Sequence, residues 1–164
     1  MKTERGGFRM LRREQLLQEL VHDSYKLGRK LAERTRCPEC GAVFHKGRWS
    51  WDVAPPDAPE HRCPACSRVH DHFPAGYVTL AGEFLDRHRD EIVNLVKKCE
   101  ASEKAEHPLE RIMAIEAAGG GLEVTTTGTH LAREIAERVH HAYKGELEFS
   151  YNREDNLLRA SWRR

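Results

Sequence analysis

Apolar residues recur every three or four positions in three stretches of the chain, which is the spacing of one buried face of an α-helix. The pattern predicts a short amphipathic helix over residues 10–21, a longer helix over residues 82–106, and a third helix that Thr129 caps and Gly145 ends. Because Cys99 belongs to the stripe of the long helix, we expect it to be a buried core thiol rather than a redox centre. The whole stripe consists of Phe84, His88, Ile92, Leu95, Val96 and Cys99.

Alternating apolar and polar positions, the pattern of a half-buried β-strand, follow in the last third of the chain. Residues 111–116 and 122–127 should pair as a hairpin, because the glycines between them tolerate the positive φ of a tight turn. Residues 146–151 and 157–162 predict a second pair of strands. With the third helix between the two pairs, this region is predicted to form a small ββαββ unit. The stripe of that helix is Leu131, Ile135, Val139 and Ala142.

Two C-x-x-C pairs lie between the first predicted helix and the long one. Two intervening residues let the chain turn so that both sulfurs of a pair reach one ion, and tetrahedral zinc takes two such pairs. Gly41 can adopt the conformation in which backbone amides point at sulfur, and the 22 residues between the pairs leave room for a hairpin and a loop. The spacing therefore predicts a zinc ribbon in which one Zn²⁺ is bound by Cys37, Cys40, Cys63 and Cys66.

Four thiolates complete the tetrahedron of zinc, so no ligand position is left for water or substrate. The metal is therefore expected to be structural and the chain not an enzyme, although a rubredoxin-like iron centre uses the same sulfur geometry. A catalytic role would have to use His70, His72, His88 or His130, and no nucleophile, base and orienting group can be assembled around them from sequence neighbours. In the run 70–72 the histidines would share one face of a strand, with Asp71 on the other.

The segment Lys46-Gly47-Arg48-Trp49-Ser50-Trp51 follows the first cysteine pair and alternates like a strand. On a strand, Trp49 and Trp51 share one face and Arg48 takes the opposite face, which places aromatic rings beside basic groups. Aromatic rings stack on unpaired bases while Lys and Arg contact phosphates, and this is how single-stranded or looped RNA is bound. In the alternative interpretation, one or both tryptophans cover the small zinc core.

Charge is unevenly distributed in this chain of 164 residues, whose net charge is only +1. Residues 1–36 contain ten Lys or Arg and five acids, which gives +5 and leaves −4 for the remainder. A basic arm on a mildly acidic body is one sign of a nucleic-acid-facing tail, although a helix with a solvated basic face gives the same count. The candidate RNA contacts are Lys26, Arg29, Lys30, Arg34, Arg36, Lys46, Arg48, Trp49 and Trp51.

Composition narrows the remaining classes of function. Five cysteines, an odd number with four of them in C-x-x-C pairs, favour metal binding in a reducing compartment over a disulfide framework. The sequence has no apolar run long enough to cross a membrane and no signal-peptide pattern at its start. We therefore expect a cytoplasmic protein without a membrane partner, and no feature indicates a small-molecule substrate.

Six short runs carry a resemblance to a known family: His22-Asp23-Ser24-Tyr25-Lys26, Gly41-Ala42-Val43-Phe44, Gly47-Arg48-Trp49, Pro74-Ala75-Gly76, Leu80-Ala81-Gly82 and His130-Leu131-Ala132. In these runs the chain resembles small bacterial zinc-ribbon proteins known as "NMD protein affecting ribosome stability and mRNA decay", over nearly all of residues 22–164. That family is similar to the zinc domain of the archaeal and eukaryotic adaptor for large-subunit export, which binds the large ribosomal subunit. The resemblance implies the four paired cysteines as ligands and points to the ribosome as partner.

We therefore expect an α+β protein with four parts: a basic N-terminal arm or helix (1–36), a zinc ribbon (37–81), a connecting amphipathic helix (82–107) and a small α+β domain (108–164). Its expected function is docking on the ribosome or on structured RNA, with phosphate contacts from the arm and stacking or shape contacts from the ribbon. The alternative is a protein-interaction adaptor that uses the ribbon and the edge strands of the C-terminal unit.

Overall fold

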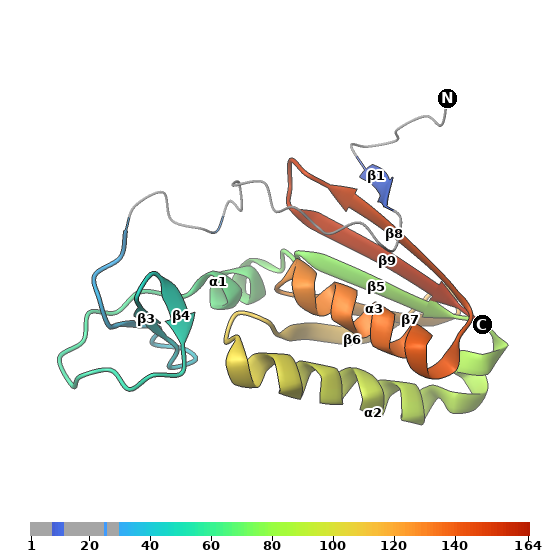
Figure 1. Ribbon diagram of the computed structural model, residues 1–164, viewed down its shortest axis with the longest axis horizontal. Helices are drawn as coiled ribbons and strands as arrows, with labels where there is room; N and C mark the ends of the chain where they lie inside the picture. Colours follow the sequence, from blue (N-terminus) through green and yellow to red (C-terminus); the bar gives the residue numbers. More distant parts are fainter. Residues whose placement is uncertain (1–7, 12–24, 26–29) are drawn as a thin grey trace.

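Two sheets of different size organise the chain in the computed structural model, which describes residues 8–11, 25 and 30–164. A six-stranded sheet carries two long helices, and a three-stranded sheet lies at the opposite end of the molecule (Figure 1). A short helix, α1 (Pro64–Asp71), stands between them. The fold is thus a mixture of helix and sheet, which agrees with the predicted α+β class.

The large sheet has the strand order β1-β8-β9-β5-β7-β6. Its only parallel pair among the described strands is β5 with β9, whereas the other neighbours run antiparallel. Val78 in β5 lies opposite Val124 on one side and Ala160 on the other, so this strand contributes to the middle of the core. The bounds are β1 Phe8–Leu11, β5 Gly76–Ala81, β6 Ile112–Ala118, β7 Gly121–Thr126, β8 Glu146–Asn152 and β9 Leu157–Arg163.

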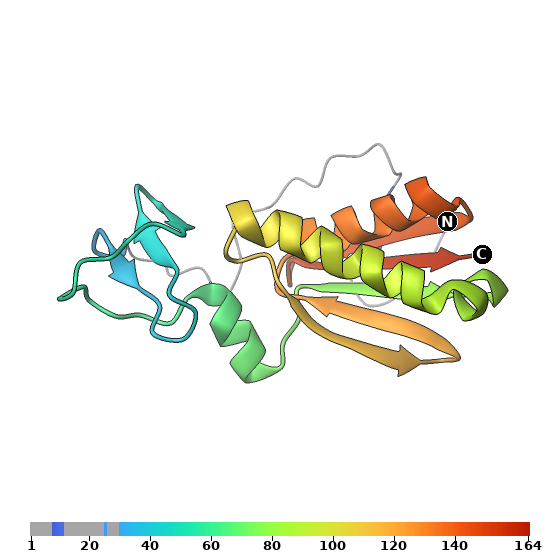
Figure 2. The same ribbon diagram turned by 90° about the horizontal axis from the view of Figure 1, so that it is seen from below.

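Two helices, α2 (Glu83–Glu106) and α3 (Thr129–Tyr143), cover one face of this sheet (Figure 2). Most residues of their predicted stripes point inward, and Ile92, Val96 and Leu131 are fully buried between the helices and the strands. The prediction is wrong for Ala142, which is exposed near the end of α3, and His88 is only partly buried. Burial of such side chains is the main stabilising contribution to a layered fold. Within the described part of the chain, none of the helices is both long enough and apolar enough to span a bilayer.

Both predicted hairpins of the last third are present. Strands β6 and β7 are joined by Gly119 and Gly120, whose positive φ angles of 54° and 80° explain why glycine is needed at this turn. Strands β8 and β9 form the second pair. The prediction that Thr129 caps the third helix is wrong, because Gly128 occupies the cap position and Thr129 is the first helical residue. Gly145 follows the helix with a φ of 93°.

Two segments take part in the large sheet although the sequence pattern assigns them elsewhere. Strand β5 belongs to the range 37–81 predicted for the zinc ribbon, yet it pairs with β7 and β9. Met10 and Leu11, predicted to begin a helix over residues 10–21, belong to strand β1, which pairs with β8. Pairing with an available sheet edge overrides local helical periodicity here. Residues 12–21 of that predicted helix lie outside the described residues.

The small sheet is a hairpin with one added strand, in the order β2-β3-β4. The hairpin turns at Lys46 and Gly47, whose φ angles of 49° and 79° are both positive, as a two-residue turn that matches the strand twist requires. This is the hairpin expected between the two cysteine pairs. The bounds are β2 Thr35–Arg36, β3 Val43–His45 and β4 Arg48–Ser50. We call residues 35–71, which include α1, the zinc module, after the ion that the sequence predicts for this segment.

Candidate metal centre

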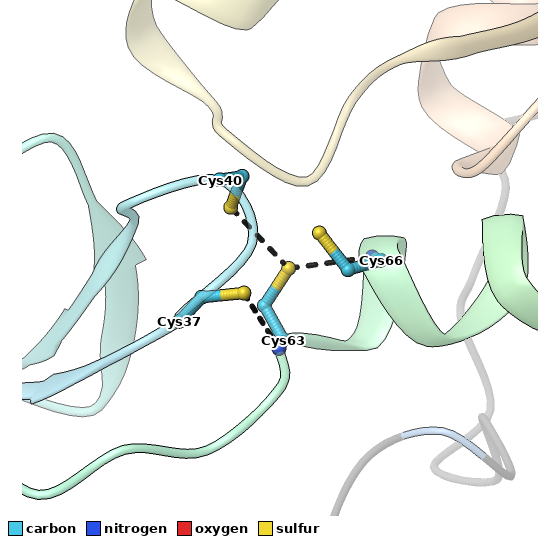
Figure 3. Close-up of side chains that lie close together, drawn as sticks. All are labelled: Cys37, Cys40, Cys63 and Cys66. Atoms are coloured by element: carbon cyan, nitrogen blue, oxygen red, sulfur yellow. Dashed lines mark hydrogen bonds between the residues drawn. The ribbon is translucent and has the colours of Figure 1, made fainter.

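The first cysteine pair lies in a tight turn between β2 and β3. The backbone N–H of Gly41 donates to the carbonyl of Cys37 at 3.0 Å, and the N–H of Cys37 donates to the carbonyl of Ala42 at 2.8 Å. Gly41 has a φ of 79°, which confirms the expectation that this position needs glycine. The turn brings the side chains of Cys37 and Cys40 to the same side of the loop (Figure 3).

The second pair opens helix α1. Cys63 is its N-cap, Pro64 occupies the first helical turn, and the Cys63 sulfur accepts a hydrogen bond from the N–H of Cys66 at 3.4 Å. A proline is tolerated there because its missing N–H would have had no partner inside the helix. Both sulfurs of the pair therefore lie at the positive end of a helix dipole, which favours thiolate over thiol.

Backbone hydrogen bonds hold the two pairs together. The N–H of Arg36 donates to the carbonyl of Pro59 at 2.8 Å, and the N–H of His61 donates to the carbonyl of Arg36 at 3.0 Å. This short parallel contact aligns the residue before Cys37 with the segment leading to Cys63. The N–H of Cys63 then donates to the Cys37 sulfur at 3.3 Å.

The four sulfurs form one compact cluster. All of them lie within 4.8 Å of one another, and those of Cys40 and Cys63 are 3.7 Å apart (Figure 3). With zinc–sulfur bonds of about 2.3 Å, the edges of a tetrahedron are about 3.8 Å long. Cys37 and Cys63 are completely buried, Cys66 is nearly so and Cys40 is partly buried, so most of the cluster is shielded from bulk water. The donor set and its spacing fit a tetrahedral metal ion.

The pKa values of the sulfurs also indicate that the cluster needs a metal ion. Hydrogen bonding to Cys40 and burial raise the pKa of Cys63 far above that of a free thiol, while the same bond lowers the pKa of Cys40 to about 5. Burial raises the pKa of Cys66 to about 11. Four adjacent thiolates repel one another in a buried site, so full ionisation needs a cation among them.

Arg111 contacts the cluster from the large sheet, and sequence analysis did not identify it. Its Nη2 atom donates to the sulfurs of Cys63 and Cys66, at 3.2 Å in each bond. The residue lies in the segment between α2 and β6, 45 positions after Cys66, and no local pattern connects it to the cysteines. A guanidinium is always charged and offers several donors in one plane, which suits contact with two anionic sulfurs.

Apolar contacts close the remaining sides of the cluster. Trp49 and Leu109 pack against it, and Trp49 also meets the ring of Phe44 edge to face with centroids 5.7 Å apart. Trp51 is 40% exposed, and its indole N–H donates to the carbonyl of Lys104 in α2 at 2.6 Å. Trp49 therefore covers the metal core, which is the alternative considered for the tryptophans, and Trp51 links the zinc module to α2.

The run His70-Asp71-His72 does not lie on a strand, so that prediction is wrong. Residues 70 and 71 end helix α1, and His72 is its C-cap in the left-handed region with a φ of 52°. The Nδ1 atom of His70 lies 3.0 Å from a carboxylate oxygen of Asp71. Asp71 also accepts a hydrogen bond from the Tyr25 hydroxyl at 3.0 Å. The group is exposed and lies outside the four-sulfur cluster.

The predicted RNA contacts lie in different parts of the molecule. Lys26 and Arg29 lie outside the described residues. Arg34 and Arg36 are bound to acceptors within the protein, Arg34 to the carbonyl of Val53 at 3.0 Å and Arg36 to the carboxylate of Glu60 at 2.7 Å. Lys46 is exposed at the hairpin turn. The remaining described candidates, apart from Trp51, line a cleft: Lys30, Arg48 and Trp49.

This cleft separates the zinc module from the large sheet and has a volume of about 1500 Å³. One wall comes from the zinc module and the residues before it, with Phe44, Trp49 and three cations. The other wall comes from the loop after α2 and the start of α3. The basic residues of the first wall are Lys30, Arg48 and Arg62, and the residues of the second are Glu106, His107, Pro108, Leu109, Glu110 and His130.

No family model, curated protein or solved structure matches this chain, so the interpretation of the site rests on its own geometry.

Proposed function

We propose that the chain binds one structural Zn²⁺ through Cys37, Cys40, Cys63 and Cys66, and that the zinc module so formed is a ribbon that docks on the ribosome or on structured RNA in the cytoplasm. The observation that carries the metal assignment is the four-sulfur cluster, with its edge of 3.7 Å between Cys40 and Cys63. Zinc is proposed rather than iron because two C-x-x-C pairs that close a four-thiolate tetrahedron are a common structural zinc site. Four sulfur ligands leave no position for a substrate, so the proposed metal is not catalytic.

The cleft supports the RNA part of the proposal. Its zinc-module wall combines the exposed cations Lys30 and Arg48 with half-buried aromatic rings, as in proteins that bind an unpaired strand. The opposite wall carries the carboxylates of Glu106 and Glu110, which would repel phosphate. A strand should therefore run with its backbone along Lys30 and Arg48 and with its bases toward the apolar side chain of Leu109. The resemblance to ribosome-associated zinc-ribbon proteins agrees with this type of partner.

We expect charge reversal on the zinc-module wall to weaken RNA binding. The variant carries Lys30→Glu and Arg48→Glu, and its matched control carries Lys97→Glu and Lys98→Glu, which change the net charge equally on exposed positions of α2. Binding to a single-stranded RNA and to bacterial ribosomal fractions is measured by anisotropy and sedimentation across a salt series. Each lost phosphate contact should lower the slope of log K against log salt by about 0.7, so the cleft variant should lose about 1.4.

Two outcomes would contradict the RNA part of the proposal. In the first, the cleft variant and the α2 control bind with the same affinity and salt slope. In the second, the unmodified protein stays entirely in ribosome-free fractions at low salt and does not bind the oligonucleotide. The second outcome would favour the alternative function, a protein-interaction adaptor.

A further inference from the structure

Arg111 is fixed in the large sheet by its backbone. Its N–H donates to the hydroxyl of Thr127 at 2.9 Å, and the N–H of Thr127 donates back to the Arg111 carbonyl at 2.9 Å. The next residue, Ile112, donates its N–H to a carboxylate oxygen of Glu100 in α2 at 2.7 Å. Strand β7 and helix α2 thus hold the segment that carries the guanidinium, and the side chain alone crosses to the zinc module.

The charge of the metal centre explains why a cation is needed at this place. Four thiolates around Zn²⁺ carry a net charge of −2, and the cluster is buried. Arg111 places a permanent positive charge 3.2 Å from two of the sulfurs, and its own Nε atom is buried without a hydrogen-bond partner in the structure. A half-buried guanidinium that lost the anionic sulfurs would keep its desolvation cost without compensation. Metal loading and the docked position of Arg111 therefore stabilise each other.

The contact of Arg111 with Cys63 and Cys66 also joins the two walls of the cleft. Its two walls belong to the two bodies that Arg111 joins, the zinc module with Arg48 and Trp49, and the loop after α2 with Leu109 and Glu110. Leu109 packs directly on the cysteine cluster, and Trp51 donates to the carbonyl of Lys104 at 2.6 Å. These contacts connect the cysteine cluster to the wall of the cleft that lies opposite the cations.

We propose that Arg111 is a positioning residue that couples metal binding to the docking of the zinc module on the large sheet, so that the cleft takes its described shape only when the four cysteines are metal-bound. The inference rests on the metal site of the proposed function and not on the identity of the partner. Coupling of this kind is reciprocal, so the factor by which bound metal favours docking is also the factor by which docking favours metal binding.

Replacement of Arg111 by methionine tests the coupling. Arg111→Met keeps an extended side chain but removes the charge and the donors to Cys63 and Cys66. The control is Arg138→Met, which removes the same charge from an ion pair with Glu134 within α3. Zinc affinity of the full chain is measured by competition with a chromogenic chelator, and docking by amide hydrogen exchange of residues 43–50 and 107–110 in the zinc-loaded protein.

Arg111→Met should bind zinc about 10- to 100-fold more weakly than the unmodified chain, the usual effect of losing a partner of the metal ligands. Both monitored segments should exchange faster, and the Arg138→Met variant should match the unmodified chain in both measurements. Arg111→Lys keeps the charge but not the planar arrangement of donors, so its zinc affinity and exchange rates should fall between those of Arg111→Met and those of the unmodified chain. If Arg111→Met does not fold, Arg111→Lys replaces it in both measurements.

Unchanged zinc affinity in Arg111→Met, or in Arg111→Lys if only that variant folds, would overturn the coupling while leaving the metal site in place. Weaker zinc binding with unchanged exchange of both segments would also overturn it, because the cleft would then be independent of the metal. Absence of zinc binding by the unmodified chain would instead overturn the proposed metal site.

Discussion

Cysteine has two different roles in this chain, and burial alone does not separate them. Cys99 is as completely buried as Cys37 and Cys63, but its neighbours are the apolar side chains of the core between α2 and the sheet. The other cysteines have sulfurs, backbone N–H groups and a guanidinium as neighbours. The helical stripe and the C-x-x-C spacing predicted both roles, because each depends on residues close in sequence. Burial of Cys99 is thereby confirmed.

Cys99 should resist alkylation in the native protein. Burial raises its pKa to about 11, so at pH 8 almost none of the reactive thiolate form is present, and solvent does not reach the sulfur. Mass spectrometry after iodoacetamide treatment should find no label on Cys99, with or without a chelator, and labels on the paired cysteines only after metal removal. Equal labelling of Cys99 in the native and the urea-unfolded chain would contradict this.

At the level of elements, periodicity located α2, α3 and both hairpins of the last third, because their buried faces repeat within a short window. It did not locate β5, whose place in the sheet depends on a parallel partner, β9, about 80 residues later in the chain. Helix α1 was also missed. It has only eight residues, and it begins with a cysteine N-cap and a proline rather than with an apolar stripe.

Helix α3 begins against a buried carboxylate, which predicts a dependence of stability on pH. The Glu110 side chain accepts a hydrogen bond from the N–H of Leu131 at 3.0 Å, yet burial raises its pKa above the usual value. Below pH 4.5 Glu110 is protonated in both states and has no effect. Above that pH the unfolded chain ionises first, so the free energy of unfolding falls as the pH rises toward the raised native pKa, and it stays at the lower value above that pKa.

The variant Glu110→Gln cannot ionise, so it should not show this decline. Urea unfolding of both proteins between pH 4 and pH 7 gives the difference in free energy of unfolding, in which the contributions of groups that the two proteins share largely cancel. We expect the glutamine variant to gain stability relative to the unmodified chain as pH rises from about 4.5. A difference that stays constant over this range, or changes with the opposite sign, would contradict the role of burial at Glu110.

At the level of the whole molecule, the zinc module and the large sheet are in contact through residues that lie far apart in the sequence. Arg111 lies 48 positions from Cys63, and Trp51 lies 53 positions from its acceptor, Lys104. The sequence predicted the clustering of the four cysteines, because two short motifs contain them. It did not predict the cleft, whose walls come from the zinc module and from the loop after α2. Three of the candidate RNA contacts line that cleft, and whether they bind RNA is the subject of the salt-series experiment.

The metal content of the purified chain tests the central claim most directly. Elemental analysis and native mass spectrometry should find one zinc per chain. Replacement of Cys37 or Cys63 by serine should abolish tight binding, because each removes one of four ligands, whereas Cys99→Ser should retain one zinc. A purified chain without bound metal, or one that keeps its zinc after loss of Cys37 or Cys63, would contradict the account.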